Sequence, residues 1–165
     1  MSLQKGANNL SNHLKQRVML FNNYIQPAEL FIKEVAEELG NKKDTSAALR
    51  VTRSVFHTLR DMLTPEESLH LVAQLPMILK AIYVDGWKPG NPNRIRSTQE
   101  FLTWLRSKSD RPEIDFGNDE DAAHAVQCVL DVVQRHVTVG EISHIVDQFP
   151  QELLFLWKTP EKHVH

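Results

Sequence analysis

The sequence predicts an all-α fold: a helical bundle of two diverged three-helix-type repeats in a pseudo-twofold arrangement, preceded by an N-terminal helix. Three observations favour this class. Apolar residues recur at intervals of three and four along most of the chain, which is the period of an amphipathic helix and not of a strand. Residues typical of helix starts stand before several of these segments. The same signals return after an offset of 74 residues, which indicates an internal repeat.

The first predicted helix covers residues 8–26. Its apolar residues follow helical spacing at Leu10, Leu14, Val18, Phe21 and Ile25. We interpret this helix as an addition to the bundle, either as a brace against it or as a contact between copies of the chain.

Two repeat units are predicted over residues 31–89 and 101–159. Each unit consists of a first helix, a long middle helix and a third helix that is interrupted or kinked at a proline, Pro76 or Pro150. Because a unit of this size is marginally stable alone, we expect the two units to share one core, so that residues 1–165 form a single domain. A short stack of helical hairpins is the alternative arrangement.

Three of the predicted helices begin with a hydroxyl side chain followed three residues later by a glutamate. In this capping box, the two side chains satisfy backbone N–H groups that the first helical turn leaves unpaired. The pairs are Thr64 with Glu67, Ser97 with Glu100, and Thr138 with Glu141. The first and third pairs are equivalent at the repeat offset.

Composition narrows the classes of partner. The 165 residues have a formal net charge of -2, which provides no global field for nucleic acid, so we expect nucleic-acid binding to be absent unless a local patch provides it. Apolar runs are too short for a membrane span, and the N-terminus lacks the apolar core of a signal peptide. The one cysteine, Cys128, allows no intramolecular disulfide. Together these features predict a cytoplasmic protein.

Four segments in a fixed order carry a family resemblance. They are Phe56-His57-Thr58-Leu59-Arg60, Thr64-Pro65-Glu66-Glu67, Gln74-Leu75-Pro76 and Tyr83-Val84-Asp85-Gly86-Trp87. With the echo of this order in the second unit, the chain resembles the bacterial DUF2267 family over residues 31–159. The resemblance implies an all-helical domain of unknown function, and it supplies no catalytic residue, substrate or cofactor. The chain departs from the pattern at Val139-Gly140, which replaces a proline-glutamate pair, and in its long loop 109–118.

A basic stripe follows the predicted middle helix of the first unit. Steps of three and four residues place Arg50, Arg53, His57 and Arg60 on one face, where they could bind phosphates or an acidic partner. We favour a solvated outer face instead, because the equivalent positions of the second unit are polar without being basic.

Two histidines occupy equivalent positions of the units. A pseudo-twofold axis could bring His70 and His144 together as a metal pair, with Asp147 as a further ligand. Ordinary surface or packing histidines are the favoured interpretation, since the sequence has no metal-ligand motif such as His-Glu-x-x-His. Cys128 is interpreted in the same way as a small buried apolar residue, although His124 could act as its base.

The segment between the units contains an aromatic residue and cations. Trp87 and Lys88 begin this turn-rich connector, residues 85–96, and could contact a partner. We favour a connector whose large aromatics close the end of the bundle.

No catalytic motif is legible, so we expect no enzymatic activity and no cofactor. The leading hypothesis is a non-catalytic helical module for interaction or regulation, through an unknown protein partner or self-association. The alternative is a small-ligand or metal-responsive domain with its site between the repeats, near Pro76 and Pro150. The first hypothesis predicts an exposed apolar patch, and the second predicts an enclosed cavity with convergent polar groups.

Overall fold

The structure, a computed structural model, describes residues 2–158, with the side chains of residues 4–16 and 19–158. Over this range it contains helices and no strands, which confirms the all-α prediction. The helices are α1 (Ser2–Glu38), α2 (Thr45–Met62), α3 (Pro65–Ala73), α4 (Met77–Val84), α5 (Thr98–Ser107), α6 (Pro112–Phe116), α7 (Asp119–His136), α8 (Val139–Asp147) and the 3₁₀ helix η1 (Gln151–Leu156). Residues 1 and 159–165 of the predicted domain, and the side chain of Val18, lie outside the described set.

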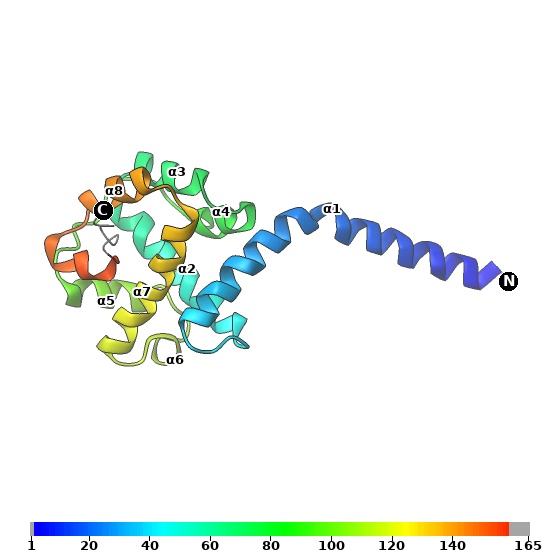
Figure 1. The fold of residues 1–165 in the computed structure, drawn as a ribbon, viewed down its shortest axis with the longest axis horizontal. Helices are drawn as coiled ribbons and strands as arrows, with labels where there is room; N and C mark the ends of the chain where they lie inside the picture. Colours follow the sequence, from blue (N-terminus) through cyan, green and yellow to red (C-terminus); the bar gives the residue numbers. More distant parts are fainter. Residues whose placement is uncertain (1, 159–165) are drawn as a thin grey trace, which may run out of the picture.

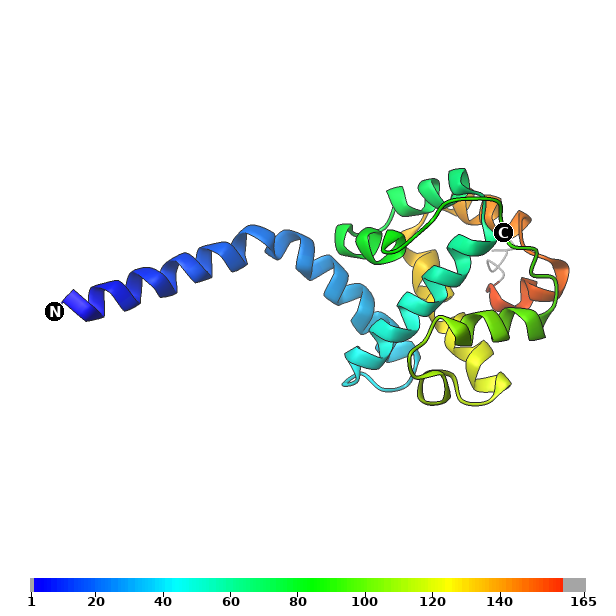
Figure 2. The ribbon, with the colours of Figure 1, turned by 180° about the vertical axis from the view of Figure 1, so that it is seen from behind.

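Helix α1 corrects one predicted boundary. We expected a helix over residues 8–26 and a separate one from residue 31, whereas α1 runs without a break from Ser2 to Glu38 and contains Pro27. A proline inside a helix removes one backbone hydrogen bond and bends the helix, but it does not have to end it. Figures 1 and 2 show that α1 changes direction along its length and extends away from a globular body formed by the other helices.

The core of the body lies around α2 and α7. Both helices contact each other and the second half of α1, and α2 also contacts α4 and α5. The large side chains that are fully buried there include Phe31, Phe56, Tyr83, Phe101 and Phe116. Phe31 of α1 meets Phe56 edge-on, with 6.2 Å between ring centroids. The second half of α1 is therefore part of the core.

The third helices of the two units have matching ends. In both α3 and α8 the threonine before the helix accepts a hydrogen bond from the glutamate N–H, at 3.2 Å for Thr64 and 3.4 Å for Thr138. The prolines end these helices as expected, and each then stands before a new helix, with Pro76 at the start of α4 and Pro150 at the start of η1. Helices α3 and α8 contact each other. The overall pseudo-twofold arrangement stays a prediction.

Within residues 2–158, no helix has both the length and the apolar character needed to cross a membrane.

Candidate functional site

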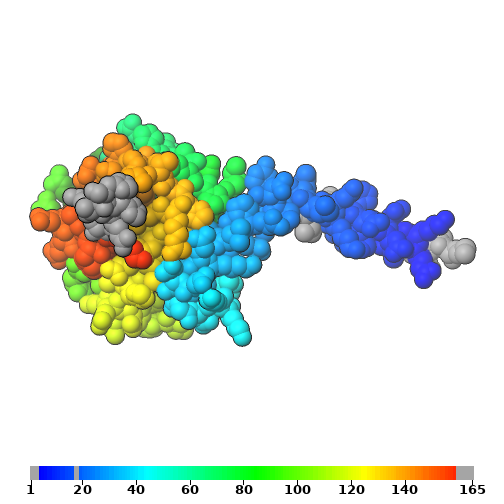
Figure 3. All heavy atoms as spheres, in the orientation of Figure 1, coloured from blue at the N-terminus to red at the C-terminus, as the bar shows by residue number. Residues whose placement is uncertain are grey.

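The exposed apolar patch that the interaction hypothesis predicts lies on the first half of α1. We call residues 4–27 the arm. Figure 3 shows the arm standing clear of the body. Its described side chains are exposed except for Asn22 and Ile25, which are half-buried, so the brace interpretation is wrong for this part of the helix. The large apolar residues exposed on the arm are Leu10, Leu14, Met19, Leu20, Phe21 and Tyr24.

Most of these residues form one stripe, and the stripe continues into the core. Steps of three, four and seven residues place its members on a single side of the helix, as in a coiled coil. The stripe consists of Leu10, Leu14, Phe21 and Tyr24 on the arm, followed by the buried Ala28, Phe31 and Val35. The face of α1 that packs into the body is therefore the same face that the arm exposes.

The arm differs from the body in charge. The first 28 residues contain Lys5, Lys15 and Arg17 but no aspartate or glutamate, so all 21 acidic residues lie further along the chain. The side of the helix opposite the stripe carries the amides Asn12 and Asn23 together with the exposed Met19. The same spacing places Arg17 on the stripe, between Leu14 and Phe21, so the arm combines an apolar stripe that carries one cation with an opposite face that carries Lys5 and Lys15.

Two residues of the basic stripe are buried inside the first unit. His57 Nε2 donates to the carbonyl of Ile82 at 2.8 Å, and Arg60 Nη1 donates to the carbonyls of Tyr83 and Asp85 at 2.8 and 2.7 Å. The solvated-face interpretation is wrong for these residues, which are 6% and 9% exposed. Burial lowers the pKa of both side chains. They satisfy carbonyls at the C-terminal end of α4 that lack helical partners.

The other two residues of the basic stripe, Arg50 and Arg53, do not share the buried surroundings of His57 and Arg60. Arg50 forms a two-pronged ion pair with Asp115 of α6, at 3.0 and 3.1 Å, and the Asp115 side chain is fully buried. Ser109 also donates to Asp115, at 2.9 Å. Arg53 is exposed. The four residues therefore do not form a continuous open basic surface.

The aromatic connector packs as we favoured. Trp87 is half-buried and meets the buried Tyr83 ring edge-on at 6.2 Å, and the Tyr83 hydroxyl is hydrogen-bonded to Ser68 at 2.7 Å. Lys88 is exposed. A partner contact at Trp87 and Lys88 stays a prediction.

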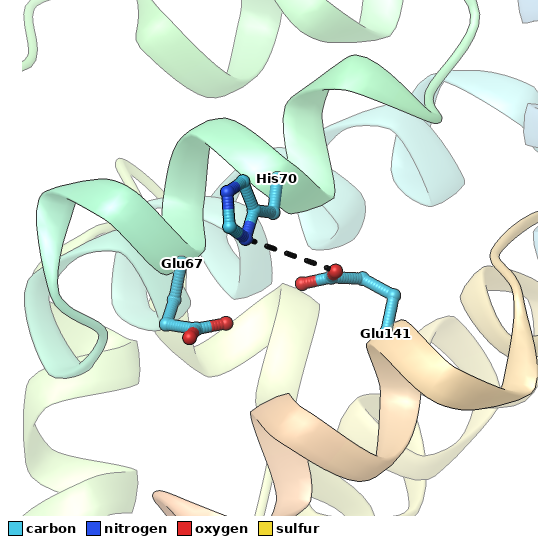
Figure 4. A group of neighbouring side chains, drawn as sticks. All are labelled: Glu67, His70 and Glu141. Atoms are coloured by element: carbon cyan, nitrogen blue, oxygen red, sulfur yellow. Dashed lines mark ion pairs between the residues drawn. The ribbon is translucent and has the colours of Figure 1, made fainter.

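One of the candidate metal ligands belongs to a group that the sequence did not indicate. Glu67, His70 and Glu141 each direct a potential ligand atom to the space between α3 and α8, and these atoms lie within 4.8 Å of one another (Figure 4). His144 and Asp147 are exposed and are not part of this group. The sequence did not indicate Glu67 and Glu141 as metal ligands, because helix capping already accounted for a glutamate at both positions. Their equivalence at the repeat offset was the signal that could have drawn attention to them.

The remaining candidates lie in the second unit, where Cys128 is buried and His124 is exposed. Cys128 lies 3.5 Å from His124, but burial raises the pKa of its thiol to about 11, which disfavours the nucleophilic thiolate. An apolar hollow of about 570 Å³ lies between α7, α8 and η1, and its lining includes Ile142, Val146 and Trp157. This hollow lies within one unit, unlike the ligand site predicted between the repeats.

The comparisons with known proteins identify a family and leave the function open. A family model described as an uncharacterized conserved protein (DUF2267) matches residues 28–156. No match to a curated protein was found. The matched segment begins at Ala28, where α1 becomes buried, so it covers the body and leaves out the arm.

Proposed function

Since the chain belongs to the DUF2267 family, whose description names no activity, we propose from its own surfaces that it is a non-catalytic module that self-associates through the arm. The observation that supports this proposal is the exposed apolar stripe on the arm, which no other helix covers within the part of the chain that the structure describes. Helices in proteins are stabilised mainly by packing of their apolar face, so an uncovered arm is less stable than the second half of α1. A second arm would stabilise it by covering the stripe.

The size of the stripe fits a reversible association. Full burial of a leucine or phenylalanine side chain contributes about 1.5–3 kcal/mol, and each arm supplies Leu10, Leu14, Phe21 and Tyr24. Because these side chains are only 46–66% exposed before association, two arms together gain on the order of 10 kcal/mol. This gain is similar to the roughly 4–15 kcal/mol that association costs. We therefore expect a dimer that dissociates on dilution.

The polar face of the arm favours a second copy over a lipid surface. Helices that lie on membranes usually have many lysines and arginines on the polar face. The face opposite the stripe carries only two cations, Lys5 and Lys15. Three cations over residues 1–28, with Arg17 on the stripe, repel a second copy only weakly at physiological salt. The coiled-coil spacing of the stripe is also suited to pairing with itself.

Sedimentation velocity of the untagged chain, over a range from micromolar to several hundred micromolar, tests the proposal. We expect a monomer–dimer equilibrium in the unaltered protein. Leu14→Asp and Phe21→Asp should shift it to monomer, because each places a carboxylate in the apolar contact. Asn12→Asp is the matched control, since it adds the same charge on the opposite side of the helix.

Two outcomes would contradict the proposal. One is a monomer at every concentration. The other is a dimer that Leu14→Asp and Phe21→Asp weaken no more than Asn12→Asp does. Circular dichroism of each variant verifies that the helical body remains folded.

We also propose a reducing, cytoplasmic location. The support is the single cysteine, Cys128, whose thiol is buried and unpaired. Fractionation of the native cell with an antibody to the protein tests this location, and recovery outside the cytoplasmic fraction would contradict it.

A further inference from the structure

The space between α3 and α8 brings together residues from both repeat units. Glu67 and His70 come from α3, and Glu141 comes from α8, where it is the repeat equivalent of Glu67. Figure 4 shows the three side chains converging from the two helices. His70 Nδ1 lies 4.0 Å from Glu141 Oε2. The group therefore links the units.

The two glutamates do not perform the second half of the capping box. In such a box the glutamate side chain accepts a hydrogen bond from an N–H at the start of the helix. Glu100 of α5 does so one residue further back, because its Oε2 accepts from the Arg96 N–H at 2.9 Å. The Thr138 N–H instead donates to the Gln74 side chain at 2.7 Å. The Glu141 carboxylate is thus free to face α3.

Each of the two carboxylates has one buried oxygen without a partner among the described residues. Glu67 Oε2 and Glu141 Oε1 are inaccessible to solvent and have no hydrogen-bond partner among the described residues. The Glu141 side chain is 11% exposed. Among the described side chains, no lysine or arginine forms an ion pair with Glu67 or Glu141. Half-buried carboxylates at this range repel each other, so a bound cation would stabilise the arrangement.

We infer that Glu67, His70 and Glu141 bind one divalent transition-metal ion, such as Zn²⁺, between the two repeat units. An imidazole nitrogen together with two carboxylate oxygens is a ligand set that suits Zn²⁺ and its first-row neighbours. Ca²⁺ and Mg²⁺ prefer sites made of oxygen ligands alone.

Small side-chain rotations complete the geometry. Ligand atoms around a tetrahedral Zn²⁺ are about 3.3 Å apart, given metal–ligand distances near 2.0–2.1 Å. The atoms of this group lie within 4.8 Å of one another, so each has to move by on the order of 1 Å. The His70 side chain is 55% exposed, which leaves room for that movement and for water as a fourth ligand.

The ion would join the two units and favour the folded chain. A ligand that binds only the folded state raises the melting temperature in proportion to the logarithm of its concentration. At a hundredfold excess over the dissociation constant, we expect Tm to rise by about 5–10 °C. This inference does not depend on the arm, and the arm variants should bind metal normally.

The experiment uses the untagged full chain after chelator treatment, with ZnCl₂ as the probe. Isothermal titration calorimetry should give one site per chain. Glu141→Gln and His70→Gln should each weaken it by at least tenfold, because each removes one metal ligand. His144→Gln is the matched control, because it changes the equivalent histidine of the second unit outside the group.

A second measurement separates ligand loss from damage to the fold. Without metal, Glu141→Gln removes one of two repelling charges, so its Tm should equal or exceed that of the unaltered protein. The inference is overturned if ZnCl₂ binds with a stoichiometry near zero, or if Glu141→Gln leaves binding intact. It is also overturned if CaCl₂ binds as tightly as ZnCl₂, or if metal-free Glu141→Gln melts several degrees lower.

Discussion

Replacing Arg60 by alanine should destabilise the body markedly, although the residue reads as part of a surface stripe in the sequence. Its guanidinium donates to the carbonyls of Tyr83 and Asp85 at the end of α4. The alanine variant leaves both carbonyls without this donor. Arg53→Ala is the matched control, because it removes the same side chain from an exposed position of the same helix.

The expected size follows from the surroundings of each carbonyl. A hydrogen bond from a charged donor contributes about 1.5–3 kcal/mol. Asp85 is exposed, so water can replace one bond, whereas Tyr83 is buried and its carbonyl loses its side-chain donor. The cost of burying the guanidinium offsets part of the loss. We therefore expect about 2–3 kcal/mol for Arg60→Ala, and within about 0.5 kcal/mol for Arg53→Ala.

Thermal unfolding followed by circular dichroism, at one fixed protein concentration, measures the difference. The expected decrease in Tm is about 5–10 °C for Arg60→Ala and about 1 °C for Arg53→Ala. Equal melting temperatures for the two variants would refute the assignment of Arg60 to the end of α4. If the basic stripe instead bound phosphates, Arg53→Ala and Arg60→Ala would both weaken binding of short DNA or RNA at low salt and leave Tm unchanged.

Three further predictions concern other buried groups. Burial lowers the pKa of His57, so the free energy of unfolding should fall as the pH drops through 6.5 toward the lowered pKa. Urea unfolding at pH 7.5 and 5.5 should show a smaller fall in this free energy for His57→Gln than for the unaltered protein. Equal falls would contradict this prediction. Arg50→Met should destabilise the fold by about 3 kcal/mol, because it leaves the buried Asp115 carboxylate without its cation. Asp115→Asn should destabilise it by about 1–2 kcal/mol, because the partly exposed Arg50 can still be hydrated. The reverse order in thermal unfolding would be evidence against this ion pair. Cys128 should react with a thiol reagent at pH 7.4 only on unfolding, since burial raises the pKa of its thiol to about 11; complete modification of the folded protein within minutes would argue otherwise.

Local chemistry made the helix starts and stops predictable. Thr64 and Thr138 begin helices in the structure because a side-chain oxygen satisfies the first-turn N–H groups wherever the helix packs. Pro76 and Pro150 end helices because their rings remove a backbone donor. The helix end predicted at residue 26 was wrong, because α1 continues through Pro27, which can bend a helix without ending it.

Contacts between distant residues were not predictable in the same way. The basic stripe on α2 was assigned to solvent by comparison with the second unit. Its spacing shows only which residues share a face, and does not show what lies opposite. The partners of His57 and Arg60 are carbonyls of α4 and the residues after it, more than 20 positions away, and a carbonyl has no sequence signature. Likewise, Glu67 meets Glu141 only because α3 and α8 pack together.

The continuity of α1 between core and arm determines how far apart two bodies can be held. At 1.5 Å per residue, the arm is roughly 35 Å long, and no loop separates it from the helix turns that anchor it in the core. A linker without structure would allow two tethered domains to sample many separations. A helix that continues out of the core without a loop instead holds a fixed length. In an arm-to-arm dimer, the overlap of the two arms would therefore set a single distance between the bodies. Lengthening the arm by one heptad would then change that spacing by a fixed step of about 10 Å.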